Sequence, residues 1–590
     1  MSLYDDASLI MIPSGIKAGT VYSQKPMDSD GQFTFTRASE ATRLVDGVVT
    51  KVRTNSILQS NDFSNAAWIK TRSSVTSGQA DKDGGTNAWS FLVDTSSTTS
   101  HFLTYNHGFT GVGTVSIYAK ANGYSWFRIY TGGDYAYFDV TNGLTGASTV
   151  GISASISSVG GGWYRCSVAV ADLSSSTVLY INIAQGDEDT VLSGTPSGTT
   201  GLFIMNAQVE AGTVATDYIA TTTVAVSEGP VANMPRLNSV AGGCPSLLLE
   251  PQRTNAITSS EYFGDSSWTK AGDVTLTSNY GISPDGYVNA DRIVAHATAG
   301  GHIVYRNIGT TGTHTVSIFA KASGYDYMFL GYDGGNLNFG IVFNLSNGTI
   351  SQNPAGLTGS IEGVGSDGWY RCTLTFNYAT TSYYFVVAPH DNSGAYNWTG
   401  NGTDGVLIYA AQAEYSSSYA TSYIPTYGTA ATRVADVCYK TGITSLIGQT
   451  EGTMFMEVDL THSNIGGVNE YLMQIYYNGS NRILMYRNTL NDLECYFLNA
   501  GVNFSSNLTT VASGRHKLAF AYKSGDCAFY IDGVQAFTHT ATFSAFSSLA
   551  DLHIGANGTG QTEAAKYSYN QALLFKTRLT NAELATLTTL

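Results

Sequence analysis

Apolar and polar side chains alternate with a period of two along many short stretches of the chain. Residues 115–120 (Val-Ser-Ile-Tyr-Ala-Lys) follow this pattern, and so do residues 163–170 (Trp-Tyr-Arg-Cys-Ser-Val-Ala-Val). The period is typical of a half-buried β-strand, whose successive side chains point to opposite faces. Asn142-Gly143 and Asp532-Gly533 follow such stretches, and these dipeptides tolerate the positive φ angles of hairpin turns. The pattern predicts an all-β chain of short strands joined by tight turns.

A duplication with a spacing of about 200 residues organises most of the chain. Residues 53–55 (Arg-Thr-Asn) recur at 253–255, and residues 162–166 (Gly-Trp-Tyr-Arg-Cys) recur at 368–372. This spacing is too long for a solenoid, whose units run about 20–50 residues. With several strands and turn signals in each copy, it predicts tandem β-sandwich or jelly-roll domains. We assign them to residues 51–222 and 255–427.

The remaining segments divide by their relation to this repeat. Residues 1–50 have no counterpart and are too few for a confident core of their own. We therefore interpret them as an anchoring or oligomerisation segment. Residues 223–254 contain four prolines, Pro230, Pro235, Pro245 and Pro251, and are predicted to be an extended linker. Residues 440–590 form a third unit with further strands and one terminal helix, which Thr580 or Asn581 can cap.

The amino-acid composition argues against two classes of function, nucleic-acid binding and membrane insertion. Charged residues make up 12% of the 590 residues, about half the usual share of roughly 25%. The balance of 29 basic against 44 acidic residues, a net charge of −15, argues against nucleic-acid binding. No apolar run approaches the roughly 18 residues of a membrane helix, so we expect no membrane insertion. The first residues also lack the cationic start and apolar run of a secretion signal.

The third unit resembles a known superfamily. The resemblance is carried by residues 514–520 (Gly-Arg-His-Lys-Leu-Ala-Phe), 529–533 (Phe-Tyr-Ile-Asp-Gly), 552–555 (Leu-His-Ile-Gly) and the closing stretch 573–584. Together they resemble the concanavalin A-like lectins and glucanases, in their laminin-G-like branch. The resemblance implies a concanavalin A-like sandwich over residues 440–590.

The whole chain is similar to surface proteins of tailed-bacteriophage virions. Residues 2–9, 35–39, 244–255 and 426–433 carry strings that recur in tail-fibre and head-fibre proteins with carbohydrate-binding-module-like sandwiches. This resemblance implies a non-catalytic structural protein on the virion surface, made in the host cytoplasm and released by lysis. It also implies other virion proteins as partners, a homotrimer, and adhesion to host-surface or environmental glycans.

Two other functions stay open from the sequence. One is a capsid-decorating or fibre-building protein whose sandwiches bind only other virion subunits. The other is a glycan hydrolase. Family-16 glucanases carry a Glu-x-Asp-x-x-Glu strand, and Glu457-Val458-Asp459 begins similarly. Retaining hydrolysis needs two carboxyl groups about 5–5.5 Å apart, and this strand lacks the second glutamate. We therefore expect no enzymatic activity.

No cofactor is predicted. The ten histidines show no metal-ligand spacing. Residues 187–189 (Asp-Glu-Asp) and Asp391 gather acidic oxygens, the ligands that Ca²⁺ prefers. Solvated loop charge explains them better and is the interpretation we adopt.

An aromatic row in each repeat is the candidate glycan-binding surface. In the first repeat Phe127 and Ile129 are predicted to enter the core. The opposite side of this strand then displays Tyr124, Trp126, Arg128 and Tyr130. In the second repeat Met328 and Leu330 are predicted to point inward, which leaves Tyr325, Tyr327 and Phe329 outside. Aromatic rings can stack on sugar C–H faces while arginine binds hydroxyls. The alternative is that these rows pack against another subunit or sheet.

Overall fold

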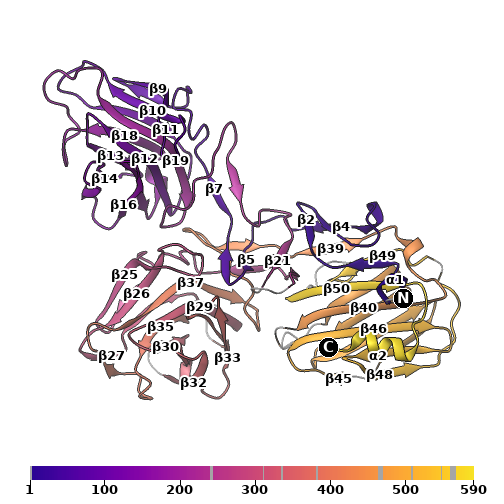
Figure 1. Ribbon diagram of the computed structural model, residues 1–590. Helices are drawn as coiled ribbons and strands as arrows, with labels where there is room; N and C mark the ends of the chain where they lie inside the picture. Colours follow the sequence, from indigo (N-terminus) through magenta and orange to yellow (C-terminus); the bar gives the residue numbers. More distant parts are fainter. Residues whose placement is uncertain are drawn as a thin grey trace.

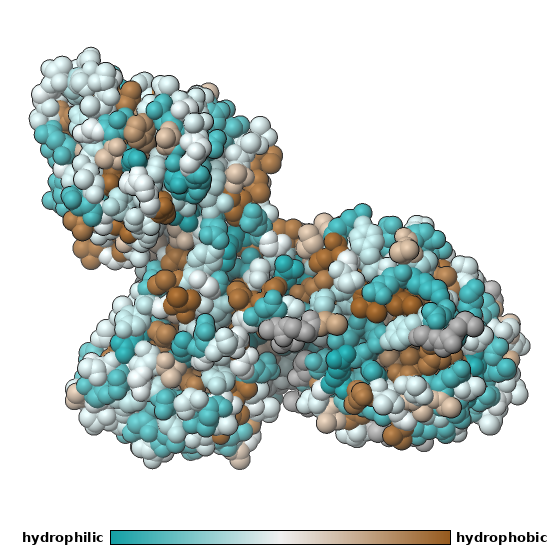
Figure 2. Space-filling model, viewed as in Figure 1, coloured by the Kyte–Doolittle hydropathy of each residue, from teal (hydrophilic) through white to brown (hydrophobic). Residues whose placement is uncertain are grey.

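The computed structural model describes residues 3–239, 244–309, 311–333, 337–379, 383–460, 462, 469–506, 509–546, 548–558 and 566–590. This part of the chain forms three β-sandwiches that meet at a common junction (Figure 1). It contains two α-helices, α1 (Leu3–Asp6) and α2 (Asn581–Thr588), and neither is long and apolar enough to span a membrane. The predicted all-β fold is confirmed. On the face shown in Figure 2, hydrophobic residues lie in small separate patches.

The first sandwich packs two six-stranded antiparallel sheets face to face. One sheet has the order β16 (Ser153–Gly160), β17 (Trp163–Val170), β12 (Gly113–Asn122), β19 (Gly201–Ala211), β10 (Ala88–Val93) and β9 (Ser73–Gln79). The other has the order β15 (Leu144–Ser148), β14 (Asp134–Asp139), β13 (Trp126–Thr131), β18 (Val178–Ala184), β11 (His101–Asn106) and β8 (Ile69–Thr71). The apolar core between them includes Phe127, Ile129 and Cys166.

The second sandwich has the same strand order. Its first sheet runs β33 (Thr358–Val364), β34 (Trp369–Tyr378), β29 (Gly312–Ser323), β37 (Gly405–Tyr415), β26 (Ala290–Ala295) and β25 (Val274–Gly281). Its second runs β32 (Thr349–Gln352), β31 (Gly340–Asn344), β30 (Tyr327–Gly331), β35 (Tyr384–His390), β28 (Ile303–Asn307) and β24 (Thr269–Ala271). Even the register shift of β12 after Ser116 recurs in β29 after Ser317. The two sequence repeats therefore share one topology.

The third sandwich is built from distant parts of the chain. One sheet has the order β21 (Arg236–Asn238), β22 (Ser246–Leu249), β50 (Tyr567–Phe575), β40 (Glu451–Leu460), β46 (Gly514–Lys523), β47 (Cys527–Ile531) and β48 (Val534–His539), with β1 (Leu9–Met11) also on β50. The facing sheet has the order β2 (Gly15–Lys17), β3 (Thr20–Tyr22), β4 (Gln32–Thr36), β39 (Val437–Lys440), β49 (Asp551–Ile554), β41 (Glu470–Asn478), β42 (Asn481–Arg487), β43 (Asp492–Asn499) and β44 (Val502–Ser505), with β45 (Thr509–Thr510) on β43.

Residues 1–50 are not the separate segment that the sequence predicted, because their strands belong to the third sandwich. Leu9 pairs with Leu574, and Phe35 pairs with Cys438. The side chains of residues 32–36 alternate between exposed and buried, so this short strand needs a sheet to cover its apolar side. The C-terminal sandwich supplies that sheet. An oligomerisation role for this segment stays a prediction.

The predicted linker also contributes strands. Of residues 223–254, β20 (Val226–Glu228) pairs with β7 (Arg53–Asn55), and β21 and β22 join the third sandwich. At its end β23 (Arg253–Asn255) pairs with β38 (Ala431–Arg433). The segment is therefore part of the junction rather than a free connection.

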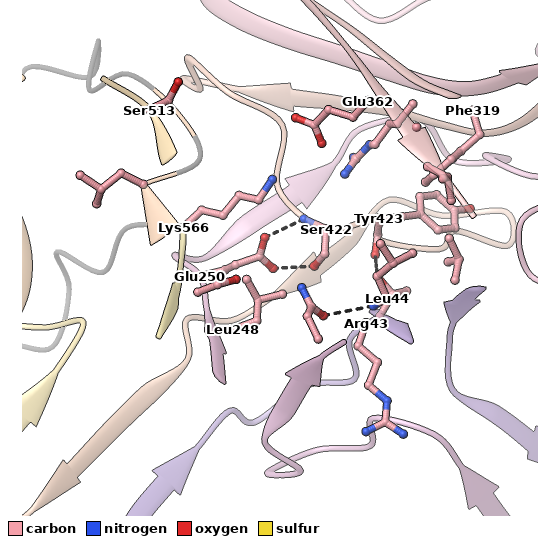
Figure 3. Close-up of a pocket in the computed structure, with 18 of the residues that line it drawn as sticks. Arg43, Leu44, Leu248, Glu250, Phe319, Glu362, Ser422, Tyr423, Ser513 and Lys566 are labelled. Atoms are coloured by element: carbon pink, nitrogen blue, oxygen red, sulfur yellow. Dashed lines mark hydrogen bonds between the residues drawn. The ribbon is translucent and has the colours of Figure 1, made fainter. Parts of the chain in front are cut away.

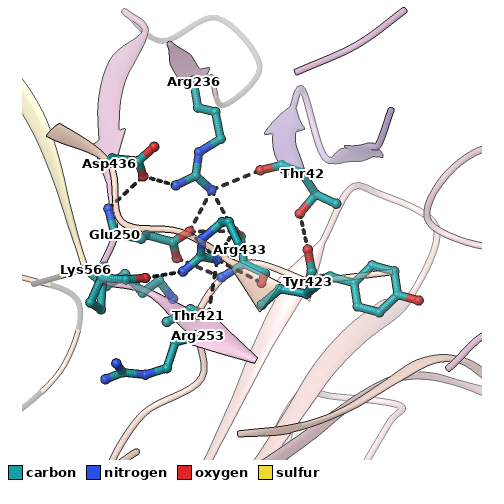
Figure 4. Close-up of polar contacts among 12 residues, drawn as sticks. Thr42, Arg236, Glu250, Arg253, Thr421, Tyr423, Arg433, Asp436 and Lys566 are labelled. Atoms are coloured by element: carbon teal, nitrogen blue, oxygen red, sulfur yellow. Dashed lines mark hydrogen bonds and ion pairs between the residues drawn. The ribbon is translucent and has the colours of Figure 1, made fainter. Parts of the chain in front are cut away.

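Five charged side chains form a buried network at this junction, which we call the junction network; Figure 4 shows Arg236, Glu250, Arg433 and Asp436. Its members are Arg37, Arg236, Glu250, Arg433 and Asp436, and each is fully enclosed by protein. Arg236 bridges both carboxylates: its Nη1 lies 2.6 Å from Glu250 Oε2, and its Nη2 pairs with Asp436 Oδ2. Arg433 Nη1 lies 2.9 Å from Glu250 Oε2, and Arg37 Nη1 lies 3.0 Å from Asp436 Oδ1. Burial alone would raise the pKa of Glu250, but Arg433 and Arg236 hold it well below its usual range.

Candidate functional site

The outer side of the β13 sheet in the first sandwich carries a continuous group of aromatic and polar side chains, which we call the aromatic face. Phe127 and Ile129 of β13 are fully buried, so the alternate residues of this strand face outward. Neighbouring strands extend the group through their register: Arg128 lies opposite Tyr137 of β14 and Asn182 of β18. Its members are Phe102, Trp126, Arg128, Tyr130, Tyr135, Tyr137, Tyr180 and Asn182.

Arg128 lies at the centre of the aromatic face. Its guanidinium carbon is 5.4 Å from the ring centre of Tyr130, 6.0 Å from that of Tyr135 and 5.8 Å from that of Tyr137. These distances are within the range of cation–π attraction. Within the described residues its hydrogen bonding is limited to one long contact of 3.4 Å, from Nη2 to Asn182 Oδ1. Most of its five N–H donors are therefore not used by the protein.

Trp126 marks one end of this face. A Cβ added at Gly146 would lie 2.6 Å from Cζ3 of Trp126 and 2.3 Å from Oδ1 of Asp187. The Trp126 ring and the Asp187 carboxylate therefore both lie close to Gly146, and a larger residue there would have to displace one of them. At the other end, the ring centres of Tyr130 and Phe102 lie 5.5 Å and 5.6 Å from that of Tyr180.

The acidic residues considered for Ca²⁺ do not converge on one point. Asp187 Oδ1 accepts a hydrogen bond of 2.8 Å from the backbone N–H of Ala147. Across the part of the chain that the structure describes, no group of three or more His, Cys, Asp or Glu side chains could hold a metal ion. Asp391 belongs to the other repeat and accepts from the N–H of Ser393. Local hydrogen bonds account for the carboxylates of both aspartates.

Tyr124 does not belong to the aromatic face, which corrects its place in the predicted row. The strand begins only at Trp126, and Gly123 has a φ of 96°, a backbone conformation that interrupts the alternation. Tyr124 instead packs against the interior core of the first sandwich.

The sequence analysis also missed the members of the aromatic face on β11, β14 and β18, since only the strand register brings them beside β13. The alternation of Tyr135 and Tyr137 in residues 134–139 was the one local signal for them.

The corresponding side of the second sandwich has an apolar cluster at its centre, bordered by partly buried tyrosines. Phe329 takes the place of Arg128 and is 1% exposed, and Ala388 lies opposite it where Asn182 lies in the first repeat. Tyr327 joins an apolar cluster around Phe329, and the Tyr396 ring packs edge-on to Phe329 with the centres 6.3 Å apart. Tyr325 packs against the core and edge-on to Trp398. Tyr325 therefore does not belong to the predicted row, whereas Tyr327 lies on the outer side and is partly buried.

The carboxylate considered for hydrolysis is already engaged on both oxygens. Glu457 of β40 is buried, its Oε1 pairs with Arg515, and its Oε2 accepts a hydrogen bond of 2.6 Å from Gln571. Asp459 points to the same side of the strand, and burial raises the pKa of its carboxyl group. The geometry thus gives Glu457 a structural role in the sheet.

Asp291 carries a buried carboxyl group whose pKa is raised well above that of an ordinary aspartate. It lies on β26, is 1% exposed, and accepts a hydrogen bond of 2.9 Å from the backbone N–H of Asn279. Burial raises its pKa to about 7, whereas an unfolded aspartate titrates near pH 3.9. Between these two values the folded protein keeps a proton that the unfolded chain releases. Stability contributed by this proton is present at low pH and is lost as the pH rises toward 7.

We therefore expect Asp291→Asn to stabilise the protein at neutral pH. The variant should melt several degrees above the wild type at pH 8 and close to it at pH 4, because the amide mimics the protonated carboxyl. Thermal unfolding followed by circular dichroism at both pH values measures the difference. Asp83→Asn, at a site whose side chain is 67% exposed, is the matched control and should show no such difference. If the difference in melting temperature between Asp291→Asn and the wild type is the same at pH 4 and pH 8, the raised pKa of Asp291 is not its cause.

Two adjoining cavities lie where the second sandwich meets the third. The larger encloses about 430 Å³ and is lined by Leu44, Glu250, Phe319 and Tyr423 among others (Figure 3). The second encloses about 320 Å³. Both are lined by Glu362, Arg371, Ser513 and Lys566, so they form one cleft, which we call the junction cleft. A further cavity of about 600 Å³ lies between the first and second sandwiches.

Comparison with known proteins gives structural likenesses only. No protein-family model matches the chain, and no curated protein matches it. Among solved structures, the carbohydrate-binding module CBM40 of the Ruminococcus gnavus IT-sialidase matches 24% of this chain and 84% of its own, with 13% identity and a TM-score of 0.21. The NanB sialidase of Streptococcus pneumoniae matches 25% of each chain, with 16% identity and a TM-score of 0.22.

A third likeness is to domain 4 of AbnA, an extracellular arabinanase of Geobacillus stearothermophilus, solved in complex with arabinotriose. It covers 26% of this chain and 73% of that one, with 13% identity and a TM-score of 0.23. At these values the likenesses assign no function. The proposals below rest on the residues of this chain.

Proposed function

We propose that the first sandwich is a non-catalytic glycan-binding module and that the aromatic face is its site. The observation that carries the proposal is Arg128, which is surrounded by tyrosine rings while most of its donors are uncommitted. A sugar presents apolar C–H faces and hydroxyl oxygens on the same ring. The rings of the aromatic face supply stacking surfaces for the first, and Arg128 supplies donors for the second.

The second sandwich supports the proposal by contrast. The two repeats share a topology, yet the second replaces the central arginine by Phe329 and packs the same side with apolar residues. A purely structural sheet surface would be served by such packing. The partly exposed arginine and aromatic rings of the first repeat therefore need another explanation, and ligand binding provides one. We propose one glycan site of this kind per chain, in the first repeat.

The biological setting follows from the sequence resemblance. We propose display on the surface of a phage virion, with adhesion to a host-surface or environmental polysaccharide as the task. Homotrimer formation and contact with other virion proteins are parts of the same prediction. A pure scaffold role is the second candidate, favoured by the apolar packing around Phe329 on the outer side of the second sandwich.

Replacement of Arg128 tests the glycan site. Arg128→Met keeps much of the side-chain volume and removes every N–H donor, so we expect at least a tenfold loss of affinity for whichever glycan the wild type retains on an array. Trp126→Ala should give a comparable loss, because it removes a stacking surface at the end of the face. Titration calorimetry with the retained glycan measures both effects.

Arg292→Met is the matched control. Arg292 also lies over a tyrosine, with its guanidinium carbon 4.9 Å from the ring centre of Tyr280, but on the second sandwich. This variant should bind like the wild type. Unchanged glycan binding by Arg128→Met, or a wild type that binds no glycan on the array, refutes the proposal. A melting temperature that falls sharply in Trp126→Ala while binding persists would identify the face as a packing surface.

A further inference from the structure

We propose that the side chains of Lys51 and Asp285 join in a covalent amide bond, an isopeptide cross-link whose formation Glu261 promotes. The bond ties the segment that enters the first sandwich to the second sandwich. These residues lie outside the aromatic face, so the inference goes beyond the proposed glycan site and does not depend on it.

The three side chains meet in the protein interior. Lys51 follows β6 (Val48–Thr50), Glu261 lies after β23, and Asp285 lies between β25 and β26. Their side chains are 5%, 2% and 0% exposed. Lys51 Nζ lies 2.5 Å from Glu261 Oε2 and 3.1 Å from Asp285 Oδ2, beside the carboxyl carbon that it attacks. Reacting groups held in such contact reach effective concentrations of about 10⁵–10⁸ M.

Tyrosine rings enclose this group of three residues. Tyr409 and Tyr423 are buried, and the Tyr423 hydroxyl donates a hydrogen bond of 3.1 Å to Glu261 Oε1. Lys51 Nζ lies 5.7 Å from the ring centre of Tyr409 and 5.9 Å from that of Tyr427. Amide formation releases water, so a site that excludes water favours the amide over its hydrolysis.

The amine of Lys51 is charged at rest and must lose a proton before it reacts. Burial disfavours its ammonium form, but Glu261, Tyr427 and Asp285 raise its pKa well above the usual value. Glu261 Oε2, in direct contact with Nζ, is placed to act as the general base. A second proton path leads through Tyr409, whose hydroxyl accepts from Lys51 Nζ at 3.2 Å and donates to Asp285 Oδ2 at 2.9 Å.

The reaction balances without any external reagent. Glu261 takes one proton from the ammonium group, and the freed lone pair of Nζ attacks Cγ of Asp285 to form the N–C bond. The nitrogen then loses a second proton, which reaches Oδ2 through Tyr409. Glu261 returns its own proton to the same oxygen, the C–Oδ2 bond breaks, and water departs. One hydrogen stays on the amide nitrogen, and Glu261 is again a carboxylate.

The other oxygen of Asp285 is held where negative charge develops. Oδ1 accepts a hydrogen bond of 2.7 Å from Ser283 Oγ and one of 3.2 Å from the backbone N–H of Tyr287. Two such donors stabilise the charge that a tetrahedral intermediate places on this oxygen. Oδ1 therefore stays in the amide. Oδ2 is the oxygen that leaves, and it accepts from Tyr409 and, at 3.1 Å, from Asn289 Nδ2.

The repeat shows that the fold itself does not require these groups. At the spacing of 200 residues that relates the two Arg-Thr-Asn sequences, Pro251 corresponds to Lys51. Asn61 corresponds to Glu261 in the same way. Proline supplies no amine and asparagine no carboxylate, so the reactive set belongs to one copy only. The alternative is a buried ion cluster that holds the domains together without a bond, and the two differ in mass.

Mass spectrometry of the unfolded full-length protein tests the inference. We expect the wild type to be lighter than the mass of its sequence by one water molecule. A tryptic digest should contain residues 44–53 joined to residues 271–292, because the linked Lys51 is no longer a cleavage site. Glu261→Gln and Lys51→Arg should each show the full mass of their sequences. Glutamine cannot take the proton, and arginine keeps the positive charge without a nucleophilic amine.

The exposed ion pair of Lys523 and Glu451 is the matched control within the same digest. Its two groups are 3.0 Å apart, but the Lys523 side chain is 53% exposed, so no linked peptide should form there. A wild type in which residues 44–53 and 271–292 are never joined overturns the proposal, and so does complete cross-linking in Glu261→Gln. If a variant fails to fold, the wild-type digest decides alone, because the linked peptide is present in it or absent.

Discussion

Replacement of Arg236 by alanine is expected to destabilise the protein by about 3–5 kcal/mol, the range for breaking a buried ion pair by removal of one partner. Arg236 is fully buried and contacts both carboxylates of the junction network, Glu250 and Asp436. Without it, Glu250 keeps Arg433 and Asp436 keeps Arg37, but the two pairs are no longer bridged. The loss should be measurable as a lower midpoint in urea unfolding followed by tryptophan fluorescence.

The junction should loosen before the sandwiches themselves unfold. Arg236 also donates to the carbonyl oxygen of Thr42 at 3.1 Å and to Ser422 Oγ at 2.7 Å, so it connects the N-terminal segment, the linker and the second repeat. We expect limited proteolysis of Arg236→Ala to release intact sandwich domains. This separation would show that the network fixes the arrangement of the domains.

Lys523→Ala is the control for this experiment. Lys523 forms an ion pair of 3.0 Å with Glu451, but its side chain is 53% exposed. Exposed pairs contribute about 0–1 kcal/mol, so this variant should unfold close to the wild type. A midpoint for Arg236→Ala that matches that of Lys523→Ala would contradict the role of the network.

Local pattern was enough to predict the repeats and the orientation of their key strand. Period-two alternation assigns Phe127 and Ile129 to the core, and the structure confirms their burial. The alternation placed Tyr124 on the outer face, and this was wrong, because alternation does not indicate the residue at which a strand begins. The alternation along one strand also could not predict which side chains surround the outer residues of that strand. That depends on which residue lies opposite on the next strand, as with Asn182 beside Arg128 and Ala388 beside Phe329.

Long-range pairing explains the largest departure from the sequence-based division. Leu9 pairs with Leu574 and Phe35 with Cys438, and nothing near either residue in the sequence marks its partner. Residues 1–50 therefore looked too short to fold, although they complete a sandwich whose other strands lie hundreds of residues away. The junction network was hidden for the same reason, since its five members come from three separate segments.

Deletion of residues 1–36 is expected to unfold the third sandwich. Five side chains of this segment are fully buried in its core: Leu9, Met11, Val21, Phe33 and Phe35. Burial of one such side chain contributes about 1.5–3 kcal/mol, so the five together are comparable with the roughly 5–15 kcal/mol that stabilises a whole domain. The deletion also exposes an edge of β50 and one of β39, which invites aggregation. We expect the truncated chain to be largely insoluble when expressed beside the full chain.

Point variants on one strand separate core loss from any effect of truncation itself. In β4 the burial pattern alternates, with Phe33 buried and Gln32 exposed. Phe33→Ser should lower the melting temperature of the third sandwich strongly, since emptying a buried phenylalanine site costs about 3–5 kcal/mol, whereas Gln32→Ser should leave it nearly unchanged. A soluble chain of residues 37–590 that melts near the wild type would show that the N-terminal strands only cover the sandwich. Such a result would restore the first interpretation of this segment, an anchoring or oligomerisation element whose partner is another subunit.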